Sequence, residues 1–180
     1  MKLTVVTSNR YKAEEVAAFF WGILDVEHID LECPEYRHDD VGEIARQKAE
    51  YAFNALKKPL IVDDTGLYIN ALNGFPGPYA SYVFHTIGNE GIGALLKEKS
   101  DKTAYFETAV AYAEEGGIRV FTGRLEGMIV APRGSGGFGY DPIFEWGDMT
   151  LAELPLTEKC VISHRARALL AFRDWIVSAR

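Results

Sequence analysis

The sequence predicts a single domain of the α/β class. Its 180 residues are 48% hydrophobic and 12% aromatic, which is enough to bury a sizeable core. No low-complexity tract, internal repeat or long linker interrupts the chain, so residues 1–180 are expected to form one domain. Short β-branched runs are mixed with segments whose apolar residues recur at helical spacing. This mixture of strands and helices is typical of an α/β fold.

Charge and cysteine content narrow the classes of function. The formal net charge of −7 argues against a nucleic-acid polymer as partner, because phosphate neutralisation needs a basic surface, whereas a small anion needs only a few donors. Cys33 and Cys160 are too few for a disulfide framework, and the N-terminal stretch MKLTVVTSNR has only a short apolar run. We therefore expect no secretion signal, no membrane span and a location in the cytoplasm.

The first segment of the chain reads as strand, polar turn and helix. Residues 3–6 form a β-branched strand, and the stretch TSNRYKAEEVAAFFWGIL then forms a turn and a helix with Asn9 at the N-cap. The inward stripe of this helix is expected to contain Val16, Phe19, Phe20 and Ile23. A turn that leads into a helix N-terminus leaves backbone N–H groups free, so it is a natural place for a phosphate.

A second helix is predicted over residues 41–57, and its side chains fall on two arcs at about 100° per residue. The polar arc contains Glu43, Arg46, Gln47, Glu50, Asn54 and Lys57. The apolar arc contains Ile44, Ala45, Ala49, Tyr51, Ala52, Phe53, Ala55 and Leu56. Lys48 is the only charged residue among them, so it is expected to point inward. Either it extends along the helix to reach water at an edge of the domain, or its ammonium group is aimed at an anion.

Two adjacent acidic residues follow the next strand. Residues 60–62 form an apolar strand that leaves Asp63 and Asp64 at its C-terminal end. Ligands of open α/β sheets bind beyond such strand ends, although an acidic pair can also simply open a turn. A phosphate-ready turn, an inward lysine and a carboxylate pair together predict a phosphate and divalent-metal site, because Mg²⁺ prefers one or two carboxylates and substrate phosphate oxygens.

Two later segments hold further candidate residues. The stretch TAYFETAVAYAEEGGIRVFTGRLEGMIV reads as long strands around a turn at residues 115–117. In the glycine-rich residues 134–145, Phe138 and Tyr140 offer ring faces and Asp141 offers an acceptor, although an ordinary hairpin loop would look alike. The stretch therefore suggests a ligand loop without specifying it.

The C-terminal segment TEKCVISHRARALLAFRDWIVSAR is predicted to be an amphipathic helix that begins among basic residues. The residues at or just before its start are Lys159, Ser163, His164 and Arg165. Cations at a helix N-terminus oppose the helix dipole. Because local violations of this kind tend to mark functional sites, these residues are candidates for ligand contacts.

The sequence as a whole resembles the inosine triphosphate pyrophosphatases, also described as XTP/dITP diphosphatases, which remove non-standard purine nucleotides from the cellular pool. The resemblance covers nearly the whole chain and rests on five ordered blocks, TSNRYKAEEV, PEYRHDDVGEIARQKA, VDDTGLYINALNGFPGPY, GGFGYDPIF and EKCVISHRARAL. It implies a long mixed central sheet with flanking helices and two lobes around a nucleotide-binding cleft. It also implies a homodimer that hydrolyses ITP, dITP and XTP to the monophosphate and pyrophosphate.

The resemblance also implies roles for individual residues. Glu35 and Asp64 would bind Mg²⁺, or Mn²⁺ in its place, and Asp64 would also be the general base, supported by Asp63. Contacts with the phosphates are implied for Thr7, Ser8, Asn9, Arg10, Tyr11, Lys12 and Lys48, with Thr65 also touching the substrate. The residues implied to bind the base are Phe138, Gly139, Tyr140, Asp141, Lys159, His164 and Arg165, with Phe138 stacked on it. Donors such as Arg165 would favour a 6-oxo group over the amine of adenine.

The resemblance leaves some questions open. Ser8 stands where many relatives have Gly, and the stretch YASY at residues 79–82 lacks the Arg or Lys that many relatives carry after the first Tyr. Two other functions remain: a pyrophosphatase for other modified nucleotides, and a catalytically silent nucleotide-binding module. The retained carboxylates Glu35 and Asp64 argue against the silent module.

Overall fold

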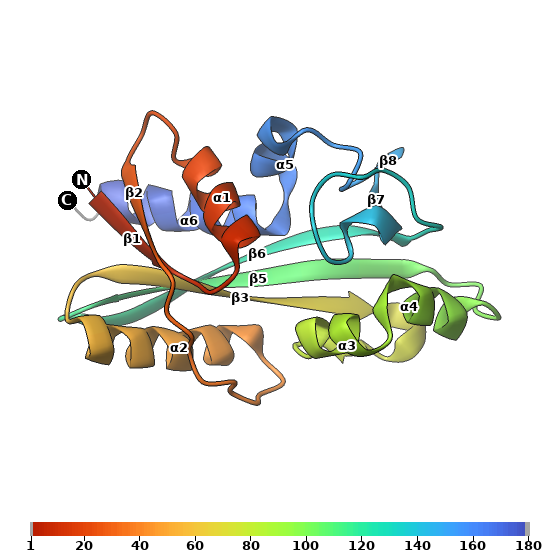
Figure 1. Ribbon diagram of the computed structural model, residues 1–180, viewed down its shortest axis with the longest axis horizontal. Coiled ribbons are helices and arrows are strands. Elements are labelled where there is room, and N and C mark those ends of the chain that lie inside the picture. The colour runs from red at the N-terminus through yellow and green to blue at the C-terminus, as the bar shows by residue number, and fades with distance from the viewer. Residues whose placement is uncertain (1, 179–180) are drawn as a thin grey trace.

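The computed structural model describes residues 2–178 and shows a mixed sheet flanked by helices (Figure 1). The strands are β1 (Lys2–Val6), β2 (Asp25–Ile29), β3 (Leu60–Ile69), β4 (Pro76–Gly77), β5 (Thr103–Glu114), β6 (Gly117–Ile129), β7 (Phe144–Trp146) and β8 (Met149–Thr150). The helices are α1 (Arg10–Phe19), α2 (Val41–Leu56), α3 (Ala80–Thr86), α4 (Gly88–Leu96), α5 (Leu156–Ile162) and α6 (His164–Ser178), with 3₁₀ turns at Asn70–Leu72 and Asp141–Ile143.

The sheet combines a parallel part with a larger antiparallel part. Its strand order is β2-β1-β3-β5-β6-β7-β8, and the short β4 pairs with β3 outside this path. β1 runs parallel to both β2 and β3, and the remaining pairs are antiparallel. The predicted α/β class with a long mixed central sheet is therefore confirmed.

Helices cover both faces of the sheet and enclose three hydrophobic cores. α1, α5 and α6 lie on one face, and α2, α3 and α4 lie on the other (Figure 1). Two cores lie on opposite faces of one end of the sheet, one beneath α1 and α6 and one beneath α2. The third core joins α3 and α4 to the far end of the long strands. The two ends of the sheet correspond to the two predicted lobes.

A belt of polar residues crosses the sheet between the lobes. In β3, residues 60–62 belong to the cores of one lobe, and Leu67 belongs to the core of the other. The strand register aligns the polar segments of three neighbouring strands side by side. We call these segments the polar belt, which consists of residues 63–66 of β3, 107–108 of β5 and 122–124 of β6.

The first helix begins as predicted and ends earlier. Asn9 is the N-cap, and Val16 and Phe20 are buried as expected. Ile23 is 52% exposed, so its place on the inward stripe was wrong. The helix ends at Phe19, and the left-handed Gly22 (φ +74°) turns the chain, so the helical spacing no longer applies at Ile23.

The second helix confirms most of the predicted apolar arc. Ile44, Ala49 and Ala52 are buried, and Lys57 ends the helix in a left-handed conformation. Tyr51 and Ala55 are exposed, against the prediction. Tyr51 lies at the margin of the buried stripe and Ala55 lies in the last turn, where the helix covers less of the sheet.

The third strand is longer than predicted. β3 continues from Leu60 to Ile69, so Asp63 and Asp64 lie inside the strand and not at its C-terminal end. Aspartate is disfavoured in strands, which is why the sequence pattern suggested an earlier end. β5 pairs with the whole length of β3 and supplies the ladder that keeps the acidic residues extended. The turn at residues 115–117 between β5 and β6 is confirmed.

We expect Gly123→Ala to destabilise the fold by roughly 1–3 kcal/mol. A Cβ atom at Gly123 would collide with the backbone O of His164 and N of Ala168, so α6 would have to move away from β6. Chemical denaturation of the wild type and the variant measures the loss. Gly93→Ala is the matched control, because a Cβ there meets nothing within 4 Å and α4 gains helix propensity. Wild-type stability of Gly123→Ala would contradict the close packing of α6 on β6.

Candidate active site

Asp63 and Asp64 point to opposite faces of the sheet, because successive side chains of a strand alternate. On the face covered by α1 and α6, Asp63 Oδ2 lies 2.9 Å from Lys12 Nζ and 3.1 Å from Arg165 Nη2. On the face covered by α2, Asp64 Oδ1 lies 2.7 Å from Lys48 Nζ. The two neighbouring carboxylates therefore belong to two separate groups of side chains.

The edge of β3 is open beside both carboxylates. β1 pairs with β3 only as far as Ile61, and β4 joins only at Leu67. Within residues 2–178, the segment 62–66 therefore has a strand partner on one side only, which is β5. Lys12, in the first turn of α1, reaches this edge and lies 3.5 Å from the carbonyl O of Asp63. The parallel part of the sheet thus ends at the polar belt, next to the N-terminus of α1.

The turn of residues 7–12 is held by its own side chains. Thr7 Oγ1 accepts a hydrogen bond from the backbone N of Asn9 at 3.1 Å. Asn9 Oδ1 accepts one from the backbone N of Lys12 at 3.3 Å, which confirms the predicted N-cap. Ser8 is not among the residues with positive φ, so it fits the turn without the strain that replacing a glycine could cause.

The electrostatics of the α2 face centre on Lys48 and Asp64. Burial lowers the pKa of Lys48, but the carboxylates of Asp64 and Glu35 raise it more, and the net pKa is above the usual value. Burial raises the pKa of Asp64, and the nearby ammonium groups only partly offset this. The predicted inward direction of Lys48 is confirmed, and a carboxylate with a raised pKa is a competent proton acceptor.

The carboxylates near Lys48 fit a metal ion that binds together with phosphate. Glu35 is exposed and lies near enough to Lys48 to affect its pKa. The described residues contain no group of three His, Cys, Asp or Glu side chains placed to hold a metal ion. One or two carboxylates are what Mg²⁺ takes from a protein when water and substrate phosphates complete its shell. Glu35 and Asp64 are carboxylates of the kind that Mg²⁺ binds in this way.

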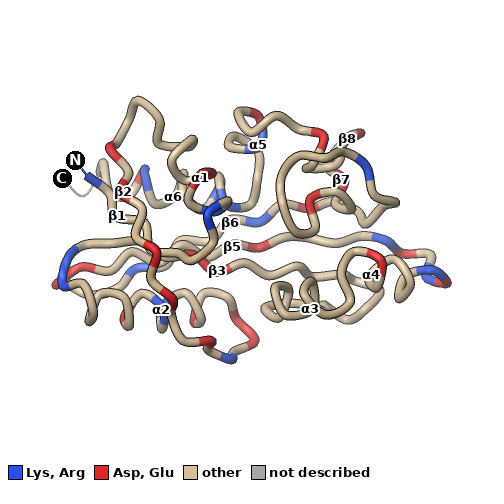
Figure 2. The backbone as a smooth tube through the Cα atoms, in the orientation of Figure 1, with Lys and Arg blue, Asp and Glu red and all other residues tan. Residues whose placement is uncertain are grey.

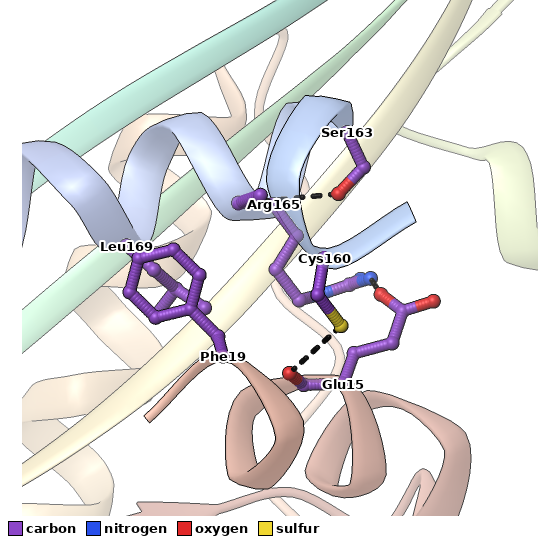
Figure 3. Close-up of a pocket in the computed structure, with 7 residues that line it drawn as sticks. Glu15, Phe19, Cys160, Ser163, Arg165 and Leu169 are labelled. Carbon is purple, nitrogen blue, oxygen red and sulfur yellow. Dashed lines mark hydrogen bonds and ion pairs between the residues drawn. The ribbon is translucent and has the colours of Figure 1, made fainter. Parts of the chain in front are cut away.

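On the other face, a series of ion pairs connects α1, α5 and α6 with the sheet, and positive and negative side chains alternate along it. Arg165 binds Asp63 on one side and Glu15 of α1 on the other, as Figure 3 shows for Glu15. Lys159 Nζ lies 2.5 Å from Glu15 Oε1 and 2.6 Å from Asp141 Oδ2. We call this set the buried ion chain, which consists of Lys12, Asp63, Arg165, Glu15, Lys159 and Asp141.

The buried ion chain is largely excluded from solvent and balanced in charge. Its members other than Lys12 have side chains no more than 7% exposed. Residues such as Phe19 and Cys160 line a narrow crevice behind Arg165 (Figure 3). Burial raises the pKa of Asp63, but Lys12 and Arg165 lower it more, so this carboxyl stays ionised.

Glu15 is a site residue that the sequence reasoning missed. It lies on the same face of α1 as Val16 and Phe19, and it is 5% exposed. The burial of Glu15 would raise its pKa, but Arg165 and Lys159 lower it below the usual value. The sequence signal was weak, because at about 100° per residue Glu15 lies about 40° from Phe19, beyond the margin of the predicted inward stripe.

Arg165 directs most of its donors at side chains of the protein, and its contact with a base stays a prediction. Its guanidinium donates to Asp63 through Nε and Nη2, to Glu15 through Nη1, and to Thr65 Oγ1 at 3.3 Å. Thr65 Oγ1 in turn lies 2.7 Å from Thr108 Oγ1 across the polar belt. Glu15 and Asp63 supply the negative charge that compensates this arginine at 2% exposure, and together with Thr65 they take four of its five N–H donors.

Phe138 of the glycine-rich loop faces α1. Its ring stacks on Tyr11 with centroids 5.3 Å apart and an angle of 12° between the planes. Lys159 Nζ lies 4.9 Å and Arg165 Cζ 5.9 Å from the centroid of the Phe138 ring. The preceding residue of α1, Arg10, pairs with Glu14 in solvent and does not reach the site. An aromatic surface next to two cations is thus present where a base was predicted to bind.

Two other residues of the loop serve its shape. Tyr140 is 5% exposed, and its hydroxyl donates to the carbonyl O of Ala80 at 2.7 Å, so the predicted open ring face of Tyr140 was wrong. Asp141 Oδ2 accepts from the backbone N of Phe138 at 2.8 Å and from Lys159. Both partners lie inside the protein, so Asp141 anchors the loop and is no open acceptor. The left-handed Gly139 accepts from Asn89 Nδ2 at 3.1 Å.

His164 begins α6 in an apolar setting. Its ring stacks on Phe106 with centroids 4.5 Å apart, and its buried Nδ1 has no hydrogen-bond partner among residues 2–178. Burial, together with the charges of Arg165 and Lys159, holds the pKa of His164 well below its usual value. His164 is therefore neutral near pH 7, and the cations of the site are lysines and arginines.

Comparisons with known proteins give a consistent result. Residues 3–175 match the model of the Ham1 family. A dITP/XTP pyrophosphatase from Methanopyrus kandleri is 50% identical over 97% of this chain and 96% of that protein. An inosine triphosphate pyrophosphatase from Emericella nidulans is 37% identical over 97% of this chain and 96% of that protein. The solved structure of a HAM1 protein from Coxiella burnetii has a TM-score of 0.86 at 29% identity and covers 99% of both chains.

Proposed function

The chain belongs to the Ham1 family, and we propose that it hydrolyses non-standard purine nucleoside triphosphates such as ITP, dITP and XTP to the monophosphate and pyrophosphate. The observation that carries this proposal is the placement of Lys12 on one face of β3 and of Lys48 with Asp64 on the other, at the segment where the edge of β3 is open. Two cations suit a polyphosphate, and a carboxylate with a raised pKa suits a proton acceptor. The names of the relatives support the class of base.

The phosphate end of the site is the turn before α1 together with Lys48. The backbone of residues 7–12, with Thr7 and Ser8, lies at the N-terminus of a ten-residue helix, where N–H groups and the helix dipole favour an anion. Asn9 can donate through its amide NH₂ group, because only its Oδ1 is used for the cap. Lys12 and Lys48 add two charges on opposite sides of β3.

Asp64 is proposed to take the proton of the water that attacks the α-phosphorus. Glu35 and Asp64 would hold Mg²⁺, or Mn²⁺ in its place, which when bound supplies positive charge to the phosphate oxygens. Lys12 and Lys48 neutralise the negative charge that develops as pyrophosphate leaves, and positioning by these residues accounts for most of the rate. Asp63 is held by Lys12 and Arg165 on the other face and takes no part in proton transfer.

The base end of the site selects through charge. A base stacked on Phe138, with Thr65, Gly139 and His164 nearby, sits close to Lys159 and Arg165. Their positive field favours the 6-oxo acceptor of hypoxanthine or xanthine and opposes the amino donor of adenine. A donor that faces a cation without a partner costs about 1 to 3 kcal/mol, which corresponds to roughly a 5- to 150-fold preference.

A panel of nucleotides tests the proposed function. The purified protein is incubated with Mg²⁺ and ITP, dITP, XTP, ATP, GTP or modified pyrimidine triphosphates, and pyrophosphate is measured. We expect rapid release from ITP, dITP and XTP and far slower release from ATP. Equal rates on ATP and ITP would contradict the base preference, and preference for a modified pyrimidine would support the rival hydrolase. No release from any nucleotide would support a silent binding module.

We further propose that the protein acts as a homodimer in the cytoplasm, on small nucleotides and not on nucleic acid. Figure 2 shows acidic and basic positions interspersed along the backbone, and the net charge of −7 opposes the binding of a polyanion. No helix within residues 2–178 has the length and apolar character that a membrane crossing requires. Light scattering after size exclusion tests the dimer, and a mass of 20.0 kDa in solution would contradict it.

A further inference from the structure

We propose that Asp63 is a positioning residue that couples the base end of the site to its phosphate end. One of its carboxylate oxygens holds both Arg165 and Lys12. The proposal rests on the function proposed above and gives Asp63 a role distinct from that of Asp64. In this proposal, the preference for the base depends on Asp63, although the base does not need to contact Asp63.

The first step is the sharing of a single atom. Asp63 Oδ2 accepts from Arg165 Nη2 at 3.1 Å, from Arg165 Nε at 3.2 Å and lies 2.9 Å from Lys12 Nζ. The two cations come from the start of α6 and the first turn of α1, which are far apart in sequence. The Arg165 side chain is 2% exposed, whereas that of Lys12 is 18% exposed and reaches the open edge of β3. Asp63 thus joins an interior cation to one that substrate phosphates can reach.

The second step is the connection of Arg165 to the loop that holds Phe138. Arg165 binds Glu15, Glu15 binds Lys159, and Lys159 binds Asp141. Asp141 in turn accepts a hydrogen bond from the backbone N of Phe138. A continuous series of charge-assisted contacts therefore runs from the aromatic surface to Lys12.

The third step is electrostatic. In a low-dielectric interior, neighbouring ion pairs polarise one another, and the position of one cation affects how strongly the shared carboxylate holds the next. A base that carries a 6-oxo acceptor draws on Lys159, which then holds Glu15 less strongly. Glu15 in turn holds Arg165 more strongly, Arg165 holds Asp63 less strongly, and Asp63 holds Lys12 more strongly. A base with an amino donor does not draw on Lys159. The correct base therefore fixes Lys12 where it neutralises the phosphates.

Geometry separates this role from that of a general base. Strand alternation places Asp63 on the face opposite Asp64, and three donors from two cations crowd its Oδ2. Asp63 Oδ2 therefore does not reach the attacking water, which is proposed to lie beside Asp64 on the α2 face. The experiment must therefore separate loss of base discrimination from loss of proton transfer.

The test compares the kcat/KM values of the Asp63→Asn variant for ITP and for ATP. We expect the ratio of kcat/KM for ITP to that for ATP to fall by roughly tenfold or more, because only the correct base uses the coupling. Equal losses on both substrates, with the ratio within about twofold of the wild type, would overturn the proposal. They would indicate that Asp63 acts as a general base or supports the fold of the site. An unchanged rate on both would also overturn the proposal. If the wild type releases no pyrophosphate from ITP, the proposed function itself fails.

A second variant guards against misfolding, because Asp63→Asn removes the counter-ion that Arg165 and Lys12 share. Asp63→Glu keeps the charge but moves the carboxylate by one methylene, so it is expected to lose the shared geometry. In the wild type, Lys12→Met should reduce ITP turnover more than ATP turnover. In the Asp63→Glu background, Lys12→Met should reduce both by the same factor. Persistence of the ITP-selective loss in that background would contradict the coupling.

Glu15→Gln tests the path between the loop and Arg165, because it breaks the link from Lys159 to Arg165 and leaves both contacts of Asp63 in place. In the Glu15→Gln background, Lys12→Met should therefore reduce ITP and ATP turnover by the same factor. Glu14→Gln is the matched control, because Glu14 of the same helix pairs with Arg10 in solvent, and the ITP-selective loss should persist in that background. Persistence of the selective loss in Glu15→Gln, or its disappearance in Glu14→Gln, would contradict the coupling.

Discussion

Asp64→Asn should lower the rate of ITP hydrolysis by roughly a thousandfold, because a positioned proton acceptor contributes about 10²–10⁴ to such a rate. The substitution keeps the size of the side chain and one oxygen ligand, but removes the negative charge that pairs with Lys48 at 2.7 Å. Both metal affinity and proton transfer should therefore suffer. Steady-state kinetics with ITP at saturating substrate measure the loss.

A magnesium titration separates the two roles of Asp64. Glu35→Gln is the control, because Glu35 is exposed and is proposed to act only as a metal ligand. Raising Mg²⁺ should restore much of the activity of Glu35→Gln and little of that of Asp64→Asn, since added metal does not replace a proton acceptor. Equal rescue of the two variants would mean that Asp64 is a ligand only.

Lys48→Met should lower kcat/KM for ITP by about a hundredfold or more, which is the usual effect of removing one group that stabilises transition-state charge. The same change removes an ammonium group that lowers the pKa of Asp64. Because burial then acts with less opposition, the pKa of Asp64 rises further. A reaction that needs ionised Asp64 must lose its rate at a higher pH, so the acidic limb of the pH–rate profile should shift upward.

Stability and activity must be separated in the Lys48 variant. Lys48→Met leaves a buried carboxylate without its partner, so a lower melting temperature is expected. The double variant Lys48→Met/Asp64→Asn removes both charges and should regain stability while remaining inactive. A normal rate and an unchanged pH profile in Lys48→Met would show that this lysine only reaches solvent.

Patterns within single helices correctly predicted the direction of Lys48 and the cap at Asn9. Helical spacing alone placed Lys48 on the apolar arc of α2, and the structure pairs it with Asp64. The same reasoning about caps placed Asn9 at the start of α1. Such inferences succeed because the direction of a side chain on a helix depends on local geometry, which the sequence encodes over a few residues.

Long-range features explain the failures. The sequence around Asp63 looked like the end of a strand, because the strand that supports it, β5, lies more than forty residues later in the chain. Tyr140 looked like an open aromatic surface, but its burial depends on Ala80 of α3. The pairing of Arg165 was not predicted, because its partner Glu15 is 150 residues away. Burial and pairing of this kind arise only when distant elements meet.

The central claim is that Asp64 and the two lysines direct water to the α-phosphorus of a non-standard purine triphosphate. Hydrolysis of ITP in water enriched in ¹⁸O, followed by mass spectrometry of the products, tests it most directly. The account predicts one labelled oxygen in the monophosphate and none in the pyrophosphate. Label in the pyrophosphate, or release of orthophosphate in its place, would contradict the account.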